Sequence, residues 1–342
     1  MSLGSAGAAD PLKVGFIYVG PISDHGWSYQ HEVGRQMVNQ TFGDSVTTSY
    51  VENVAEGADA ERVIDQLAAA GSKLIFTTSF GFMNPTLRVA QRYPDVKFEH
   101  ATGYKRDANV ATYSARFYEG RYVVGQIVGR LTKSNIIGYV GSHPIPEVYQ
   151  GINAFTIALR RVNPNAEVRV IWVNSWYDPA REAEAAKALM DQGADVILQH
   201  TDSPAPMQAA AERGAWAVGQ SSDMTRFGPQ NHITSIVDDW GPYYVSRVKA
   251  VMDGTWTATD VWGGFSASML HLAPYNPKIG TELIALGEMT QKSIEDGSLH
   301  PFQGPFKNQD GKLVVGEGER LTDEQILRMD YYVEGVQGRP PR

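Results

Sequence analysis

The chain has 342 residues, which is long enough for two α/β lobes instead of a single core. Its hydrophobic fraction of 42% and charged fraction of 20% are typical of a globular protein, and no segment reaches the ~18 consecutive apolar residues of a membrane-spanning helix. The net charge of −8, without a cluster of Lys and Arg, argues against nucleic-acid binding, and the absence of Cys excludes disulfides, thiolate metal sites and a Cys nucleophile.

The first ten residues, MSLGSAGAAD, are small and polar. They lack the cationic start and the apolar stretch of a signal peptide. We therefore exclude them from the fold and expect them to be an added segment, joined to the mature amino terminus of an exported protein.

The next part of the chain alternates predicted strands with predicted helices. The first strand begins at Lys13 and ends at a Gly-Pro break. The elements expected after it are a helix over 29–41, a strand over 46–51, a helix over 59–70, a strand over 74–79, a helix opened by Pro85, strands over 96–99 and 110–115, and a helix over 119–131. Such alternation predicts a parallel sheet covered by helices on both faces.

A second series of the same kind follows. Its predicted elements are a strand over 136–140, a helix from Glu147, a strand over 167–173, a helix over 179–192, a strand over 196–199, a helix over 205–213, and strands over 216–219 and 232–237. A helix over 241–253, a strand near 266–272 and a helix over 278–296 complete the pattern. Two such series predict two similar doubly wound lobes.

These series also suggest the domain boundaries. We expect one lobe from residues 11–113 and 239–262, and a second lobe from residues 114–238 and 263–300. The tail, residues 301–342, carries a hairpin signal at Asn308-Gln309-Asp310-Gly311 and a short helix capped by Thr322, with a Gln three residues later. We expect this tail to pack on the lobes.

Aromatic and hydrogen-bonding side chains follow the predicted strands at their carboxyl ends. Open α/β sheets bind their ligands at this edge. In chain order these candidates are Asp24, Trp27, Ser28, Phe80, Phe82, Trp176, His200, Asp202, Asp223 and Asp238. Phe117, which begins a helix at an inferred crossing between the lobes, fits core packing and a ligand wall equally well. The pattern predicts a site for a flat small molecule with polar edges.

The two tryptophans suggest how such a molecule would be held. Trp27 follows Asp-His-Gly in a loop, and Trp176 holds the corresponding place in the second series. Two indoles facing each other would sandwich a planar ring, and one stacked base contributes about 1 to 3 kcal/mol in known platforms. The alternative is that Trp27 only packs against the edge of the sheet and has no contact with a ligand. Phe80 and Phe82 are two positions apart, and we expect only one of them to face the ligand.

The acidic candidates supply the polar half of the hypothesis. Asp223 and Asp238 both end strands of the second series, where a buried carboxylate needs donors such as ring N–H groups, amines or sugar hydroxyls. Asp239 points to the opposite face of the strand from Asp238, so the two cannot act as a catalytic pair. Asp24 can also be explained as a helix cap.

Signatures of enzymes are mostly missing from the sequence. It contains no G-x-x-x-x-G-K-[ST], no G-x-S-x-G and no H-E-x-x-H, and its eight His residues are scattered. We therefore expect no catalytic residues, no metal and no cofactor. Two other classes stay open. A nucleoside hydrolase or phosphorylase would need a positioned nucleophile, a phosphate nest or a metal, and a ligand-sensing domain would signal instead of transporting.

Four segments carry a family resemblance that covers residues 13–296. They are KVGFIYVGPISDHGWSYQHEVG, IFTTSFGFMNPTLRVAQRYPDVKF, ARFYEGRYVVGQIVGRLTKSNIIGYVG and ADVILQHTDSPAPMQAAAERG. Together they resemble the basic membrane protein family of ABC-transporter substrate-binding proteins, which includes purine nucleoside receptor lipoproteins of bacteria. The resemblance implies a type I periplasmic binding protein, in which two α/β lobes joined by a hinge hold the ligand in the cleft between them.

The resemblance also implies roles for single residues. Asp24 matches the family's first loop, whereas Trp27 and Ser28 replace its usual Phe and Asn. Trp176 would be the aromatic residue of the second lobe and Asp223 its strand-end acid. Asp238 stands where nucleoside-binding members typically have Lys, and a carboxylate cannot donate as an ammonium does. This departure favours a free purine base over a nucleoside.

The expected function is therefore that of an exported receptor, periplasmic or at the cell surface. It would bind a purine base or nucleoside without altering it and deliver it to an ABC permease of the inner membrane. We expect a monomer that neither binds nucleic acid nor inserts into the membrane.

Overall fold

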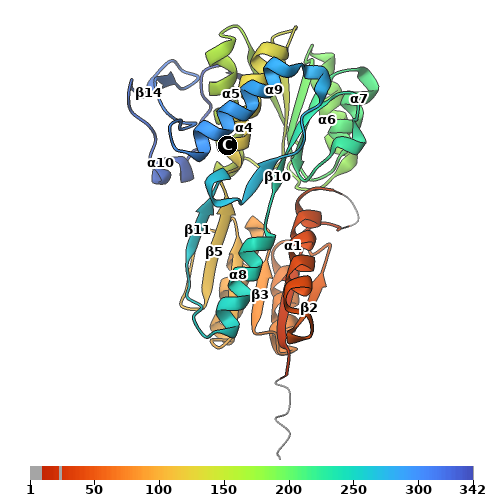
Figure 1. The fold of residues 1–342 in the computed structure, drawn as a ribbon, viewed down its shortest axis with the longest axis vertical. Helices are drawn as coiled ribbons and strands as arrows, with labels where there is room; N and C mark the ends of the chain where they lie inside the picture. Colours follow the sequence, from red (N-terminus) through yellow and green to blue (C-terminus); the bar gives the residue numbers. More distant parts are fainter. Residues whose placement is uncertain (1–9, 23–24, 342) are drawn as a thin grey trace, which may run out of the picture. The chain divides into compact units, whose positions relative to one another are not determined.

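The computed structural model describes residues 10–22 and 25–341 (Figure 1). Contacts divide the described chain into two compact units. Unit 1 comprises residues 10–22, 31–114 and 240–262, and unit 2 comprises residues 25–30, 115–239 and 263–341. Residues 25–30, which the sequence-based boundaries place in the first lobe, are thus grouped with unit 2. Each unit contains its own mainly parallel sheet, and the predicted α/β class is confirmed.

Unit 1 is a sheet with the strand order β11-β5-β4-β3-β1-β2, in which the four pairings from β5 to β2 are parallel. Its elements are β1 Leu12–Ile17, α1 Trp27–Phe42, β2 Val46–Val51, α2 Ala58–Ala69, β3 Leu74–Thr77, α3 Met83–Arg92, β4 Lys97–Ala101, β5 Val110–Ala115, α8 Gly241–Met252 and β11 Asp260–Gly263. The first turn of α1, at Trp27 and Ser28, is grouped with unit 2.

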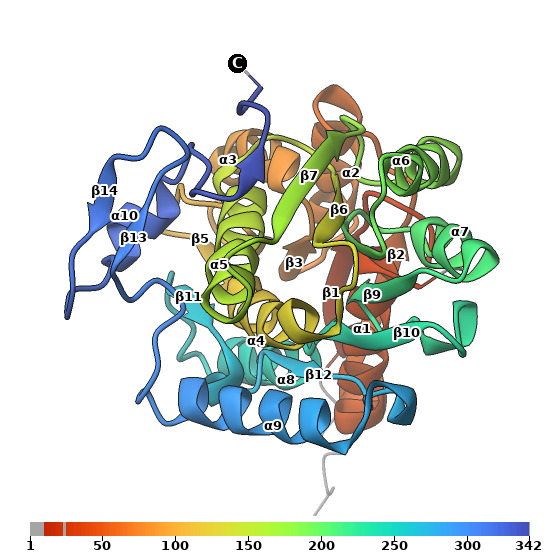
Figure 2. The same ribbon diagram turned by 90° about the horizontal axis from the view of Figure 1, so that it is seen from above.

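Helices cover both faces of the unit 1 sheet. Figure 2 shows α1 and α8 on one face and α2 and α3 on the other. Ile17, Ile75 and Phe98 pack under α2 and α3, whereas Phe16 and Phe76 stack at 4.8 Å between ring centroids on the opposite face. Because neighbouring strand residues point to opposite faces, the continuous apolar runs of these strands fill both cores.

Unit 2 is a sheet with the strand order β12-β10-β9-β8-β6-β7-β15. Its elements are α4 Phe117–Leu131, β6 Ile136–Gly141, α5 Pro146–Val162, β7 Glu167–Trp172, α6 Pro179–Asp191, β8 Val196–His200, α7 Ala205–Arg213, β9 Trp216–Ser221, β10 His232–Asp238, β12 Leu270–Leu272, α9 Thr281–Glu295, β13 Phe306–Lys307, β14 Leu313–Val315, α10 Asp323–Leu327 and β15 Val336–Gln337. Only β12 pairs antiparallel with its neighbour in this sheet.

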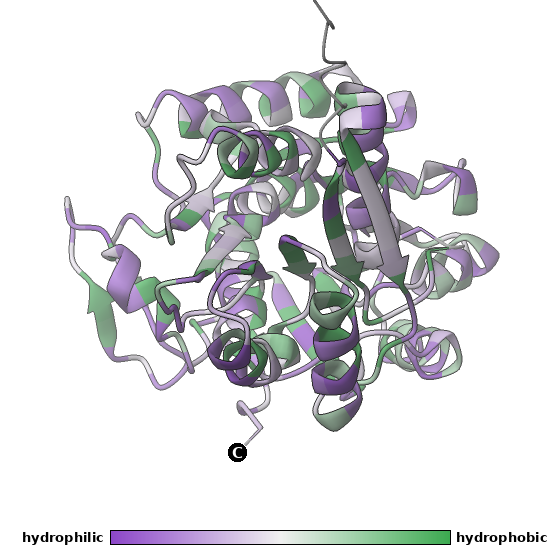
Figure 3. Ribbon diagram, turned by 90° about the horizontal axis from the view of Figure 1, so that it is seen from below, coloured by the Kyte–Doolittle hydropathy of each residue, from purple (hydrophilic) through white to green (hydrophobic). Residues whose placement is uncertain are grey.

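The two faces of the unit 2 sheet are also covered. Figure 2 shows α4 and α5 on one side and α6 and α7 on the other, with α9 outside α4. The helices are banded purple and green in Figure 3, as expected where one side of a helix is buried and the other is solvated. No helix in the described parts of the chain is both long and apolar enough to cross a membrane.

Several element boundaries differ from the predicted ones. The expected strand near 266–272 is shortened to β12, because Phe265–Ala267 forms a 3-10 turn before it. The last long helix begins at Thr281 because Pro277–Ile279 forms a separate 3-10 turn. In the tail, the predicted hairpin is confirmed, because β13 and β14 pair antiparallel. The predicted capped helix is also confirmed, because Thr322 and Gln325 form a reciprocal capping box.

Candidate functional site

Parallel strands of unit 2 bring the ends of four strands to one edge of the sheet. β6 and β8 pair Gly141 with His200, and β9 and β10 pair Ser221 with Val237, the residue before Asp238. The loops that follow these strands therefore start side by side. This is the edge where open α/β sheets bind ligands.

Aromatic side chains line this edge in one connected series. The ring of Phe117 lies 6.0 Å from that of Trp27 and 6.2 Å from that of His200, measured between centroids. Trp176 lies 6.5 Å from His200 and 4.8 Å from His143. Phe117 is buried, whereas Trp27 and Trp176 are half-buried. Four predicted residues are thus brought together, and a sandwich between the two indoles stays a prediction.

A close backbone approach places Trp27 on unit 2. The amide of Gly26 donates to Ser222 Oγ at 2.7 Å, and a Cβ at Gly26 would collide with the carbonyl oxygen of Asp202. Gly26 also has φ 115°, a conformation that residues other than glycine rarely adopt. The lack of room for a Cβ and the backbone conformation therefore both favour glycine at this position. The amide of Asp202 in turn donates to the carbonyl of Trp176 at 2.9 Å. These bonds tie the loop before α1 to the loops after β7, β8 and β9.

His200 has a defined tautomer at this edge. Its Nε2 lies 3.1 Å from Glu147 Oε1, in the first turn of α5, so we assign the proton to Nε2 and leave Nδ1 as an acceptor. Burial lowers the pKa of His200, and Glu147 opposes that effect. Nδ1 is buried without a hydrogen-bond partner among the described residues.

Asp238 is the most unusual group of the site. It is 0% exposed, and neither carboxylate oxygen forms a hydrogen bond of regular geometry within the described chain. Burial raises its pKa well above the ordinary range, the nearby Ser221 hydroxyl and Arg121 lower it, and Glu147 raises it. A buried acceptor without donors is costly, so this carboxyl is suited to a ligand that brings N–H groups.

Asp202 adds a second acidic group. Burial raises its pKa well above the ordinary range, and Glu182, Asp238 and Glu147 raise it further. Glu182 is itself held by the Ser203 hydroxyl at 2.7 Å. Several carboxyls therefore make this edge acidic.

The remaining predicted residues have other places. Phe82 is 0% exposed in the apolar core of unit 1 under α3, so it packs instead of lining a site. Asp223 is exposed, and its carboxylate caps a 3-10 turn by accepting from the amide of Thr225 at 2.9 Å. Phe80 is half-buried in unit 1, 6.3 Å from the Tyr104 ring. Ser28 is buried in the first turn of α1, and Asp24 lies outside the described residues.

Three residues of this edge escaped sequence analysis. Arg121 lies one helical turn after Phe117 and is 0% exposed, with Nη2 donating to the carbonyl of Gln199 at 2.7 Å. Glu147 and His143 belong to the loop and first turn after β6. The only available signal was spacing, because Arg121 is four residues from an aromatic candidate and shares its helix face.

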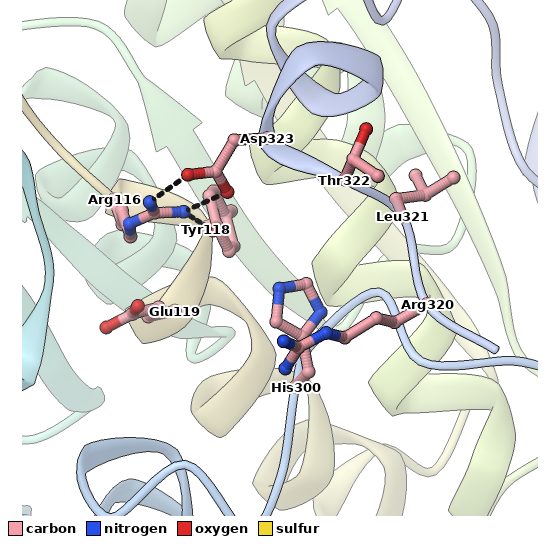
Figure 4. A pocket seen from close by; sticks show the side chains of 8 residues that line it. All are labelled: Arg116, Tyr118, Glu119, His300, Arg320, Leu321, Thr322 and Asp323. Carbon is pink, nitrogen blue, oxygen red and sulfur yellow. Dashed lines mark hydrogen bonds and ion pairs between the residues drawn. The ribbon is translucent and has the colours of Figure 1, made fainter. Parts of the chain in front are cut away.

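A separate pocket of about 480 Å³ lies between the start of α4 and the tail of unit 2 (Figure 4). Its lining includes Arg116, Glu119, His300, Arg320 and Asp323. Arg116 forms a bidentate ion pair with Asp323, at 2.8 and 2.5 Å, and Glu119 accepts from the amide of Phe265 at 2.8 Å. Most of its charged groups are thus already paired, and the pairs attach the tail to α4.

A family model described as ABC transporter substrate-binding protein PnrA-like, Bmp, matches residues 12–285. The chain belongs to this family. It is 53% identical to a purine-binding protein of Brucella abortus, over 99% of this chain and 97% of the relative. It is 38% identical to a putative ABC transporter glucose-binding protein of Haloferax volcanii, over 99% of this chain and 83% of the relative. The predicted family and the solute-binding function are confirmed.

Solved structures show the same fold. A solute-binding protein of an ABC transporter system from Aeropyrum pernix matches with a TM-score of 0.73 at 20% identity, covering 86% of this chain and 94% of that one. A transcriptional activator of the comK gene from Bacillus halodurans matches with a TM-score of 0.70 at 20% identity, covering 84% and 99%. Proteins with different tasks thus share this fold, and the ligand must be argued from the site.

Proposed function

We propose that this solute-binding receptor takes a purine, and a free base in preference to a nucleoside. The observation that carries the proposal is the combination of neighbouring aromatic groups, Trp27, Phe117 and Trp176, with the buried carboxyl of Asp238, which has no regular hydrogen bond among the described residues. A purine offers a planar face for stacking and N–H groups at its edge. The N–H groups of the ligand would then meet the Asp238 carboxyl, which has no regular hydrogen bond among the described residues.

The electrostatics of the site support a neutral ligand rich in donors. Glu147, Asp202 and Asp238 act on one another's charge at this edge. A phosphate dianion beside these carboxyls would further oppose their ionisation, whereas the ring N–H or amino group of a base would bind to them. Nucleotides are therefore excluded from the proposal.

The relatives support the ligand class only in part. The 53% identical relative is described as purine-binding, and the 38% identical relative as glucose-binding. A sugar could satisfy Asp238 through hydroxyl groups, but it would use the aromatic faces less fully than a planar ring does. We further propose that the ligand is released unchanged to an ABC permease and that the protein acts outside the cytoplasm, as receptors of such importers do.

A thermal unfolding panel with adenine, guanine, inosine and glucose tests this function. A ligand that binds only the folded protein stabilises it by about 2.7 kcal/mol at a hundredfold excess over Kd. We expect a clear rise in melting temperature with a purine base, a smaller rise with inosine and none with glucose. A rise with glucose alone would contradict the purine proposal, and chromatography that detects a converted purine would contradict a pure binding role.

A further inference from the structure

Unit 2 contains an unusual group of buried polar atoms behind the aromatic edge. Nε and Nη1 of Arg121, the hydroxyl of Tyr139, Nδ1 of His200 and both oxygens of Asp238 are all buried without a hydrogen-bond partner among the described residues. These residues also act on one another's charge, since Asp238 and Tyr139 both influence Arg121. Buried polar groups normally have partners, so such a concentration requires an explanation.

Arg121 is anchored at one end only. Its Nη2 donates to the carbonyl of Gln199, near the end of β8, and to Oε1 of Gln220, near the end of β9. One guanidinium therefore holds two neighbouring strands just before they enter the site. The orientation of the Gln220 amide follows from this bond, because the oxygen must face the guanidinium.

The same orientation directs the Gln220 amino group toward the Ser221 hydroxyl. Nε2 of Gln220 donates to the hydroxyl oxygen of Ser221 at 3.0 Å. Ser221 Oγ then accepts, and its own hydrogen is free to point at the nearby Asp238 carboxyl, whose pKa this hydroxyl lowers. The donors thus run in one direction, from Arg121 through Gln220 and Ser221 to Asp238. Such an order stabilises an acceptor, which here is the ionised carboxylate.

We infer that Arg121 is a positioning residue of the ligand site, which acts through Gln220 and Ser221 to hold Asp238 as an acceptor for a ring N–H or amino group. The inference rests on the proposed function, because it assumes that a base occupies the site. It adds that the ligand must present a donor at this position. A heterocycle with only acceptors on that edge is excluded.

Other charges surround Asp238 and set the background for a test by pH. Glu147 from α5 and Asp202 after β8 oppose its ionisation, and His200 and Tyr139 lie in the same cluster. Arg121 from α4 favours its ionisation. Removing Arg121 should therefore shift the protonation of Asp238 to higher pH, whereas a purely architectural residue would leave the pH profile in place.

The experiment is a calorimetric titration of adenine into four proteins between pH 5 and pH 9. The wild type is compared with Arg121→Met, Gln220→Glu and the control Arg130→Met, which removes an exposed Arg of the same helix. Gln220→Glu keeps the acceptor for Arg121 but removes the donor to Ser221, and the new ion pair should preserve the fold. If Arg121→Met does not fold, the Gln220→Glu variant therefore still tests the role of Arg121.

We expect both site variants to bind adenine about 5- to 150-fold more weakly at neutral pH, as for the loss of one buried hydrogen-bonding arrangement. Their affinity should also fall at a higher pH than that of the wild type on acidification, and Arg130→Met should match the wild type. An equal loss at every pH, or no loss, would overturn the role of Arg121. A wild type that binds no purine would instead contradict the proposed function.

Discussion

Glu99 in unit 1 and Asp238 in unit 2 are both fully buried carboxylates, but their hydrogen-bonding environments are opposite. In unit 1, Glu99 is 0% exposed and accepts from Arg247 Nε at 2.5 Å, the Tyr243 hydroxyl at 2.6 Å and Trp256 Nε1 at 2.7 Å. In unit 2, Asp238 is equally buried and has no regular hydrogen bond within the described chain. The difference is the one we expect between a structural acid and the acid that we propose binds the ligand.

The comparison has a physical basis. Burying a charge is costly, and three charge-assisted or neutral donors offset that cost for Glu99. For Asp238 only the nearby Ser221 hydroxyl and Arg121 oppose the burial that raises its pKa, and neither carboxylate oxygen has a regular hydrogen bond within the described chain. Burial of Asp238 should therefore lower the stability of the protein, and under the proposed function the ligand offsets this cost. Functional sites often carry such uncompensated groups.

The largest effect should come from breaking the satisfied acid. Arg247→Met leaves Glu99 buried without its ion-pair partner, and we expect it to lower the free energy of unfolding by about 3 to 5 kcal/mol. Denaturant titration measures this loss. Adenine affinity should be unchanged in the fraction that folds. A loss below 1 kcal/mol would mean that Glu99 does not depend on Arg247.

A comparable contrast holds for the aromatic residues. Phe82→Ala should cost about 3 to 5 kcal/mol of stability, because it leaves a cavity in the core of unit 1, and should not affect binding. Trp27→Ala and Trp176→Ala should leave the fold intact and weaken adenine binding by about 1 to 3 kcal/mol. Unfolding curves measure the stability of all three variants, and calorimetry measures their affinity for adenine. Normal binding by both tryptophan variants would refute the stacking role.

A smaller effect is expected from Glu119, the buried acid of the pocket in Figure 4. Burial raises its pKa to about 7, above its ordinary value of 4.5. The folded protein therefore keeps this proton between pH 4.5 and 7 while the unfolded chain loses it, and the contribution to stability falls by about 2 to 3 kcal/mol as the pH rises through this range.

Glu119→Gln should remove that part of the pH dependence, because the amide oxygen still accepts from Phe265 and carries no charge. The free energy of unfolding should then exceed that of the wild type at pH 8 and approach it near pH 4.5. Glu288→Gln, at an exposed position of α9, is the control and should change neither value. Identical pH profiles for wild type and Glu119→Gln would show that the Glu119 carboxyl is not penalised by burial.

The sequence predicted the architecture better than the site. The β-α alternation predicted the parallel sheets. The capping pair Thr322 and Gln325 predicted the short helix α10. Trp27, Trp176 and Asp238 were predicted at strand ends because the end of each apolar run in the sequence marks the end of a strand. β11 and β15 were missed, since short strands depend on partners far away in the chain.

The places that the structure gives to the other candidate residues also have local causes. Phe80 and Phe82 point in different directions because they lie in a 3-10 turn, and the sequence does not show which of them enters the core. An exposed Asp that caps a turn, such as Asp223, has the same sequence pattern as a strand-end ligand residue. Arg121 was missed because a charged residue inside a helix usually faces solvent, and only the structure shows it buried beneath two strand ends.

The central claim is that Asp238 is kept unsatisfied for a purine base. Calorimetric titration of adenine and inosine into the wild type and Asp238→Asn tests it most directly. We expect Asp238→Asn to be at least as stable as the wild type, and to bind adenine about 5- to 150-fold more weakly with a smaller loss for inosine. Unchanged adenine affinity, or equal losses for both ligands together with a loss of stability, would contradict the claim.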